Sequence, residues 1–90
     1  MAIRFKAESI EASNPFFQVF FATDSDENLS EGKSAKCAYS ALAKDKDGYM
    51  TAVLDFSKMP EWKGKITTLR FDPANSAGEY YIDKIMLIEA

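Results

Sequence analysis

Apolar and polar residues alternate along several short stretches of this chain, and an alternation of period two is typical of half-buried β-strands. In the first stretch, Ile3, Phe5 and Ala7 alternate with charged side chains, which predicts a strand with one face on a core. The stretch 16–23 predicts the strongest strand, because it is rich in aromatic residues. Between the two, a Ser-Asn-Pro sequence at 13–15 breaks the chain.

The two faces of the stretch 16–23 are expected to differ in what they contact. Successive side chains of a strand point to opposite faces of its sheet. If Phe17, Val19 and Phe21 face the core, then Gln18 and Phe20 lie on the opposite surface. That surface therefore carries an aromatic ring next to an amide.

Four further strands are predicted downstream. They cover residues 34–42, 49–56, 66–71 and 80–88. The stretch 34–42 is the weakest of these predictions because alanine, which is depleted in strands, is common in it. In 49–56, the even-numbered residues from Met50 to Phe56 are expected to face inward. The Asp47-Gly48 pair between these two stretches is a hairpin turn signal.

The last predicted strand breaks the alternation. Tyr80 and Ile82 share one parity, whereas Ile85 and Leu87 share the other. A β-bulge near Asp83 would return both pairs to the same face, because one extra residue shifts the register by one. The alternative is a strand that is buried on both faces. The sequence favours the bulge.

Length and composition agree with one small globular domain over residues 1–90. The apolar fraction of 47% is too high for a disordered chain, and no stretch predicts a stable helix. We therefore expect an all-β fold, an antiparallel jelly-roll-like β-sandwich of five to six strands. The single cysteine excludes an internal disulfide within these residues.

Two motifs near the end of the chain resemble a known family. The first is W-x-G-x-I-x-x-L-R-F-D-P, from Trp62 to Pro73, and the second is G-x-x-x-I-D-x-I-x-L, from Gly78 to Leu87. Together with the upstream stretch 18–23, they resemble galactose-binding-like jelly-roll domains over residues 3–89. Such domains are often carbohydrate-binding modules of secreted or cell-surface glycoside hydrolases. The resemblance implies a polysaccharide or glycan as partner and an extracellular or cell-surface location.

The composition argues against several other function classes. There is no histidine, so the common Ser-His-Asp, Cys-His and His-metal sites are excluded, and no phosphate-binding glycine motif is present. The net charge of −3 and the scattered basic residues argue against a nucleic-acid partner. No apolar stretch is long enough for a membrane span, and the first residues do not form the apolar core of a signal peptide. We expect a non-catalytic domain.

The face opposite the core is the best candidate for saccharide binding. Its polar and aromatic candidates are Gln18, Phe20, Tyr39, Thr51, Thr68 and Arg70. Arg70 has an alternative role, because it could pair with a carboxylate on a neighbouring strand. The alternative function is a structural or adhesive spacer without a sugar ligand. A solvent-exposed aromatic ring beside convergent polar groups would favour sugar binding, and a face covered by charged side chains would favour a spacer.

The resemblance also implies roles for Trp62 and Asp83. The tryptophan of this motif usually belongs to the scaffold, and we favour that role over a platform for sugar stacking. A carboxylate that matches Asp83 helps several members of the family to bind a structural calcium. We favour a bulge residue that accepts hydrogen bonds from nearby backbone N–H groups, with structural calcium as the alternative.

The family usually has one or two strands before the position of Ile3, and this chain has none. A missing strand would leave an open edge and partly wet apolar residues, which favours a homodimer. The alternative is a compact monomer in which the connection 57–65 closes the gap. The residues expected to be partly wet are Phe5, Phe17, Val19, Phe21, Leu54, Leu69 and Ile82.

Overall fold

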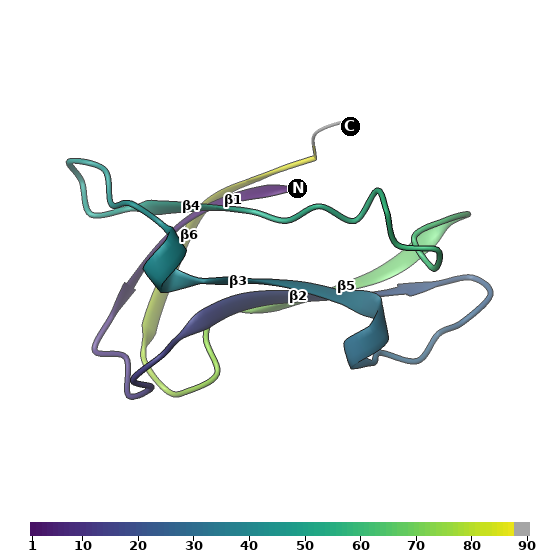
Figure 1. Cartoon of the computed structure of the whole chain (residues 1–90), viewed down its shortest axis with the longest axis horizontal. Coiled ribbons are helices and arrows are strands. Elements are labelled where there is room, and N and C mark those ends of the chain that lie inside the picture. The colour runs from purple at the N-terminus through teal and green to yellow at the C-terminus, as the bar shows by residue number, and fades with distance from the viewer. Residues whose placement is uncertain (88–90) are drawn as a thin grey trace.

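The computed structural model describes residues 1–87 and folds them into two antiparallel sheets that pack as a sandwich (Figure 1). The strands are β1 (Ala2–Glu8), β2 (Phe16–Thr23), β3 (Ser34–Ala38), β4 (Met50–Val53), β5 (Ile66–Asp72) and β6 (Glu79–Met86). Sheet A has the order β4-β1-β6, and sheet B has the order β3-β2-β5. The predicted all-β sandwich is confirmed, and so is the number of six strands.

The described residues contain no α-helix, only two one-turn 3-10 helices. These are η1 (Glu31–Lys33), before β3, and η2 (Tyr39–Ala41), after it. Neither has the length or the apolar composition of a transmembrane segment.

The core lies between the two central strands, β1 and β2. Ile3 and Phe5 of β1 and Phe17, Val19 and Phe21 of β2 are completely buried, as the alternation predicts. The rings of Phe5 and Phe17 meet across the two sheets with their centroids 4.8 Å apart. Tilted aromatic pairs of this kind add to the free energy that burial itself contributes.

The predicted strand 34–42 is wrong in its second half. The strand ends at Ala38, and the chain turns into η2, where the Tyr39 N–H donates to the Pro15 carbonyl. The reason is topological: β3 belongs to sheet B and the next strand, β4, belongs to sheet A, so the chain must cross between the layers here. Figure 1 shows η2 at this crossing.

The turn at Asp47-Gly48 forms, but it does not join a hairpin. Gly48 has a φ of +82°, a conformation that glycine adopts without strain, and the Gly48 N–H donates to the Asp45 carbonyl. The strands on either side of the turn lie in different sheets, because β4 pairs with β1 rather than with β3. The ladder of β4 stops at Val53, whereas the alternating burial continues to Phe56 as predicted.

The bulge in the closing strand is confirmed. Arg4 of β1 pairs with Lys84, whereas the next residue, Phe5, pairs with Ile82, so Asp83 is the extra residue. As a result Ile82 and Ile85 lie on the same side of sheet A, opposite Phe5 and Ile3 respectively. The end of the predicted strand, Ile88, lies outside the described residues.

The sandwich is closed on one side and open on the other. Most residues expected to be partly wet are fully buried, so that part of the prediction is wrong. Trp62 lies in the connection between β4 and β5 and stacks on Phe56, with the ring centroids 4.6 Å apart. It covers the end of the core at which this connection crosses between the sheets. Of the seven residues in that prediction, only the two on β5 and β6 are partly exposed: Leu69 is half-buried and Ile82 is 43% exposed.

Candidate functional site

Four of the six predicted ligand residues lie on the outer face of sheet B: Gln18 and Phe20 of β2, and Thr68 and Arg70 of β5. Phe20 of β2 pairs with Arg70 of β5, and Gln18 lies two residues away on the same face. The Arg70 guanidinium lies over the Phe20 ring, with its central carbon 4.2 Å from the ring centroid. Phe20 is therefore only 6% exposed, and its ring does not present a free face to a sugar.

The polar groups of this face bind one another. The Gln18 side-chain amide donates to Glu31 Oε2 at 3.0 Å and to Ser34 Oγ at 2.9 Å. The Arg70 guanidinium donates two hydrogen bonds of 3.1 Å to the Asp72 carboxylate. Both N–H donors of the Gln18 amide and two of the five N–H donors of Arg70 are therefore already used within the chain.

A loop covers part of the same face and is fixed by a buried lysine. The Lys33 ammonium group lies 3.1 Å from the Asp26 carboxylate and also donates to the Asp26 carbonyl at 3.2 Å. The pKa of Asp26 is lowered, first by the hydrogen bond from the Asn28 N–H and then by the Lys33 side chain. Polar and charged side chains of the outer face of sheet B and its covering loop thus bind one another.

The other two predicted ligand residues lie elsewhere. Thr51 of β4 is exposed and pairs with Arg4, so it lies on the outer face of sheet A, on the opposite side of the sandwich. Tyr39 begins η2 and packs toward the core, with its ring centroid 5.3 Å from that of Phe5. The six candidates therefore do not form one site.

Arg4 organises the outer face of sheet A and holds Asp83. The guanidinium contacts the carboxylates of Asp45 at 2.8 Å and Asp83 at 3.1 Å, and it lies over the ring of Tyr49 at 4.1 Å. The predicted partners of Asp83, backbone N–H groups, are replaced by this arginine. A guanidinium on the carboxylate does not fit a calcium ligand, and no group of three metal-binding side chains occurs among residues 1–87.

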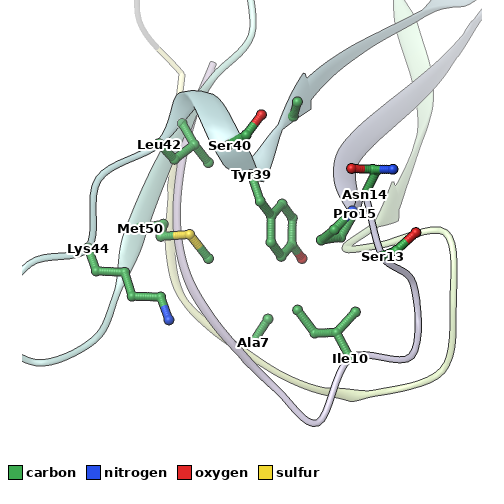
Figure 2. Close-up of a pocket in the computed structure, with 11 residues that line it drawn as sticks. Ala7, Ile10, Ser13, Asn14, Pro15, Tyr39, Ser40, Leu42, Lys44 and Met50 are labelled. Carbon is green, nitrogen blue, oxygen red and sulfur yellow. The ribbon is translucent and has the colours of Figure 1, made fainter.

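A pocket of about 390 Å³ lies at the end of the sandwich where η2 crosses between the layers (Figure 2). It is bounded by the loop between β1 and β2, by η2 and by the chain that leads into β4. Its lining residues are Ala7, Ile10, Ser13, Asn14, Pro15, Ala38, Tyr39, Ser40, Leu42, Lys44 and Met50. The volume is within the range of sites for small molecules.

Tyr39 is the only predicted ligand residue that lines this pocket. Its ring stands between the loop 13–15 and Met50 (Figure 2). The hydroxyl group donates to the Pro73 carbonyl, and burial raises the pKa of Tyr39, so the phenol stays protonated at physiological pH. The ring is thus held in one place and offers an apolar wall.

The polar groups around this wall come from two sides. Ser13 and Asn14 lie on one side of the pocket and Lys44 on the other, with Ser40 beside Tyr39 (Figure 2). Within residues 1–87, none of these four side chains makes a hydrogen bond or an ion pair. Their donors and acceptors are exposed and free to bind a ligand.

Sequence reasoning missed these four residues. The sequence predicts only a chain break at 13–15, and it places Ser40 in the predicted strand 34–42. The sequence signal for a site here is the pair of small polar residues before Pro15, because loop residues lie on the surface and often carry function. Their proximity to η2 depends on the crossing between sheets.

Trp62 lies far along the chain from this pocket, at the covered end of the core. Besides its stacking on Phe56, its ring meets that of Phe21 edge-to-face at 4.9 Å. Its ring is therefore partly buried and packs against core side chains. Its scaffold role stays a prediction.

Comparison of the chain with models of protein families gives no match, and comparison with curated proteins and with solved structures gives no significant match.

Proposed function

We propose that this domain is a non-catalytic carbohydrate-binding module and that the pocket beside η2 is its saccharide site. One observation carries the proposal: Ser13, Asn14, Ser40 and Lys44 line the same pocket as the ring of Tyr39, and their side chains have no partner among residues 1–87. Sugars are bound by this combination, an aromatic wall for the C–H face of the pyranose and unpaired donors and acceptors for its hydroxyl groups.

The chemistry of the pocket supports binding rather than catalysis. The side chains that line it include a single amine and no carboxyl, thiol or imidazole group. Hydrolysis of a glycosidic bond usually requires two carboxyl groups on either side of the bond. Lys44 adds a positive charge, which favours sugars with a carboxylate or sulfate group over neutral ones.

The resemblance of the Trp62–Pro73 and Gly78–Leu87 motifs to galactose-binding-like jelly-roll domains supports the same class of function. The sandwich of two antiparallel sheets is compatible with this family. On this proposal the domain acts outside the cell or at its surface, and its partner is a polysaccharide or glycan rather than nucleic acid or a membrane.

A glycan array with the purified domain tests the proposal, with neutral and acidic sugars side by side. Titration of a bound glycan into isotopically labelled protein then locates the site. We expect amide signals of Ser13, Asn14 and residues 39–44 to shift, and those of 18–20 and 68–72 to stay in place. Shifts on the outer face of sheet B would assign binding to that face instead. Absence of binding to every glycan would reject the function.

A second candidate is a structural or adhesive spacer. The observation in its favour is the outer face of sheet B, where charged side chains cover Phe20 and bind one another. A spacer of this kind would bind no glycan on the array, and its pocket variants would keep every measured property of the unchanged domain.

A further inference from the structure

The strand β6 forms an open edge of sheet A. On its one side it pairs with β1, and within residues 1–87 no strand pairs with its other side. Ile82 and Ile85 are each 43% exposed, although Phe5 and Ile3 opposite them are completely buried. An exposed strand edge with apolar side chains readily pairs with another strand, because its free N–H and C=O groups and its apolar surface remain unsatisfied.

The sequence of β6 is self-complementary in charge. Around the midpoint between Asp83 and Lys84, the order Ile-Asp-Lys-Ile becomes Ile-Lys-Asp-Ile when it is read backward. In an antiparallel pair of two identical strands about this midpoint, each acid therefore lies opposite a lysine. Within residues 1–87, Lys84 has no ion pair of its own, so its charge is available for such a contact.

The bulge makes the same segment self-complementary in side-chain direction. Because Asp83 is the extra residue, Asp83 and Lys84 both lie on the outer face with Arg4, whereas Ile82 and Ile85 both lie on the inner face. The order of inner and outer positions from Tyr80 to Leu87 is therefore the same in both directions. Without the bulge, antiparallel pairing about this midpoint would place inner residues opposite outer ones.

We propose that the β6 edge pairs with the β6 edge of a second copy of this chain about a two-fold axis between Asp83 and Lys84. The pairing joins the two copies of sheet A into one six-stranded antiparallel sheet. Ile82 lies opposite Ile85 of the second copy, Asp83 opposite Lys84, and Tyr81 opposite Met86. An isologous contact of this kind closes on itself and gives a dimer rather than a filament.

Neighbouring registers are unfavourable. A two-fold axis at Asp83 would put the two Asp83 carboxylates opposite each other, and an axis at Lys84 would do the same for the two lysines. Like charges directly opposite are destabilising in a sheet. Shifts of the midpoint by one residue also place apolar inner side chains opposite charged outer ones. The register about the Asp83–Lys84 midpoint is the one that satisfies both patterns.

Sedimentation velocity of the full chain over the micromolar range tests the proposal. We expect a reversible dimer of twice the 10.1 kDa monomer mass, because a contact along one strand edge is at the small end of specific interfaces. Lys84→Asp places an acid opposite the partner's Asp83 twice in each dimer and is expected to weaken dimerisation at least tenfold. Lys36→Asp is the matched control, with the same charge change on β3 in the other sheet, and should dimerise like the unchanged chain.

Charge exchange separates this contact from a general effect on folding. The double change Asp83→Lys with Lys84→Asp restores opposite charges and keeps an acid beside Arg4, so dimerisation should return. A mixture of the Lys84→Asp and Asp83→Lys chains should form a heterodimer that neither chain forms as a homodimer. Melting curves show whether each variant is folded. A monomeric unchanged chain, or a Lys84→Asp chain that dimerises as well as the control, would overturn the proposal, and the edge would then serve another partner.

Discussion

The outer face of sheet B and the pocket beside η2 carry similar side chains but differ in what those side chains bind. Each region has an aromatic ring, an amide, a hydroxyl group and a cation. On the outer face, Gln18 and Arg70 bind carboxylates of the same chain, and Arg70 covers the ring of Phe20. In the pocket, Asn14 and Lys44 have no partner among residues 1–87. Residue type alone therefore does not identify a binding surface; the state of its hydrogen bonds does.

The largest effect is expected from removal of the covered ring. Phe20→Ala deletes a buried aromatic side chain and should lower the free energy of unfolding by about 3–5 kcal/mol. Urea denaturation measures this loss. The folded fraction should still bind glycan with unchanged affinity, because Phe20 lies outside the pocket. A Phe20→Ala variant that keeps its stability but no longer binds glycan would show that the outer face of sheet B, and not the pocket, is the binding site.

A smaller loss of stability is expected from Gln18→Ala. The change removes two hydrogen bonds and leaves the Glu31 carboxylate without its amide donor, which costs about 1–3 kcal/mol. The denaturant midpoint should fall with an unchanged slope. A midpoint equal to that of the unchanged chain would show that the face is not held by this network.

Acid should affect the two regions differently. A carboxyl group whose pKa is lowered in the folded state stabilises that state at every pH above its ordinary pKa of 3.8. This contribution is lost as the pH falls through the lower pKa of the folded state. Asp26 has this direction of shift, and so do Asp45 and Asp55. The melting temperature should therefore fall below pH 3.8, and Asp26→Asn should reduce this dependence.

Glu27→Gln provides the control for Asp26→Asn. It removes one negative charge from the same loop, but the Glu27 side chain makes no hydrogen bond or ion pair among residues 1–87. It should leave the acid dependence of the melting temperature in place. The pocket is lined by no carboxyl or imidazole group, so glycan affinity should stay constant between about pH 5 and pH 8. A steep change of affinity in that range would assign binding to groups outside the pocket.

The smallest effect on stability is expected in the pocket itself. Asn14→Ala and Ser40→Ala remove exposed side chains without partners, so the free energy of unfolding should change by less than about 0.5 kcal/mol. Each change removes hydrogen bonds to a bound glycan, and calorimetry should show an affinity that is about two- to tenfold weaker. Lys36→Ala, on an exposed strand position outside the pocket, should change neither quantity.

Much of the fold could be predicted from the sequence because burial imposes a period of two on each strand. The bulge at Asp83 was visible for the same reason: two apolar pairs of opposite parity must share one core. The end of β3 at Ala38 was not visible, because Tyr39 continues the alternation. Only the need to cross from sheet B to sheet A turns the chain there.

The candidate site was harder to predict than the fold. The sequence placed Gln18, Phe20 and Arg70 on one face, and the structure agrees. It did not show that Gln18 and Arg70 donate hydrogen bonds to Glu31 and Asp72, because the loop that carries Glu31 has no alternation to fix its position. The pocket is assembled from segments about thirty residues apart in the chain, and such proximity is a property of tertiary structure.

The strand order of sheet A has a consequence for the rate of folding. Its central strand, β1, lies between β4 and β6, and Ala2 pairs with Met86 near the other end of the described chain. The chain loses conformational entropy when such a long loop closes, before the stabilising contacts between the strands have formed. We therefore expect folding in milliseconds to seconds rather than in microseconds. During synthesis, β1 is made before both of its partners in the sheet, β4 and β6. The apolar face of β1 therefore stays without a sheet partner until β4 has been synthesised.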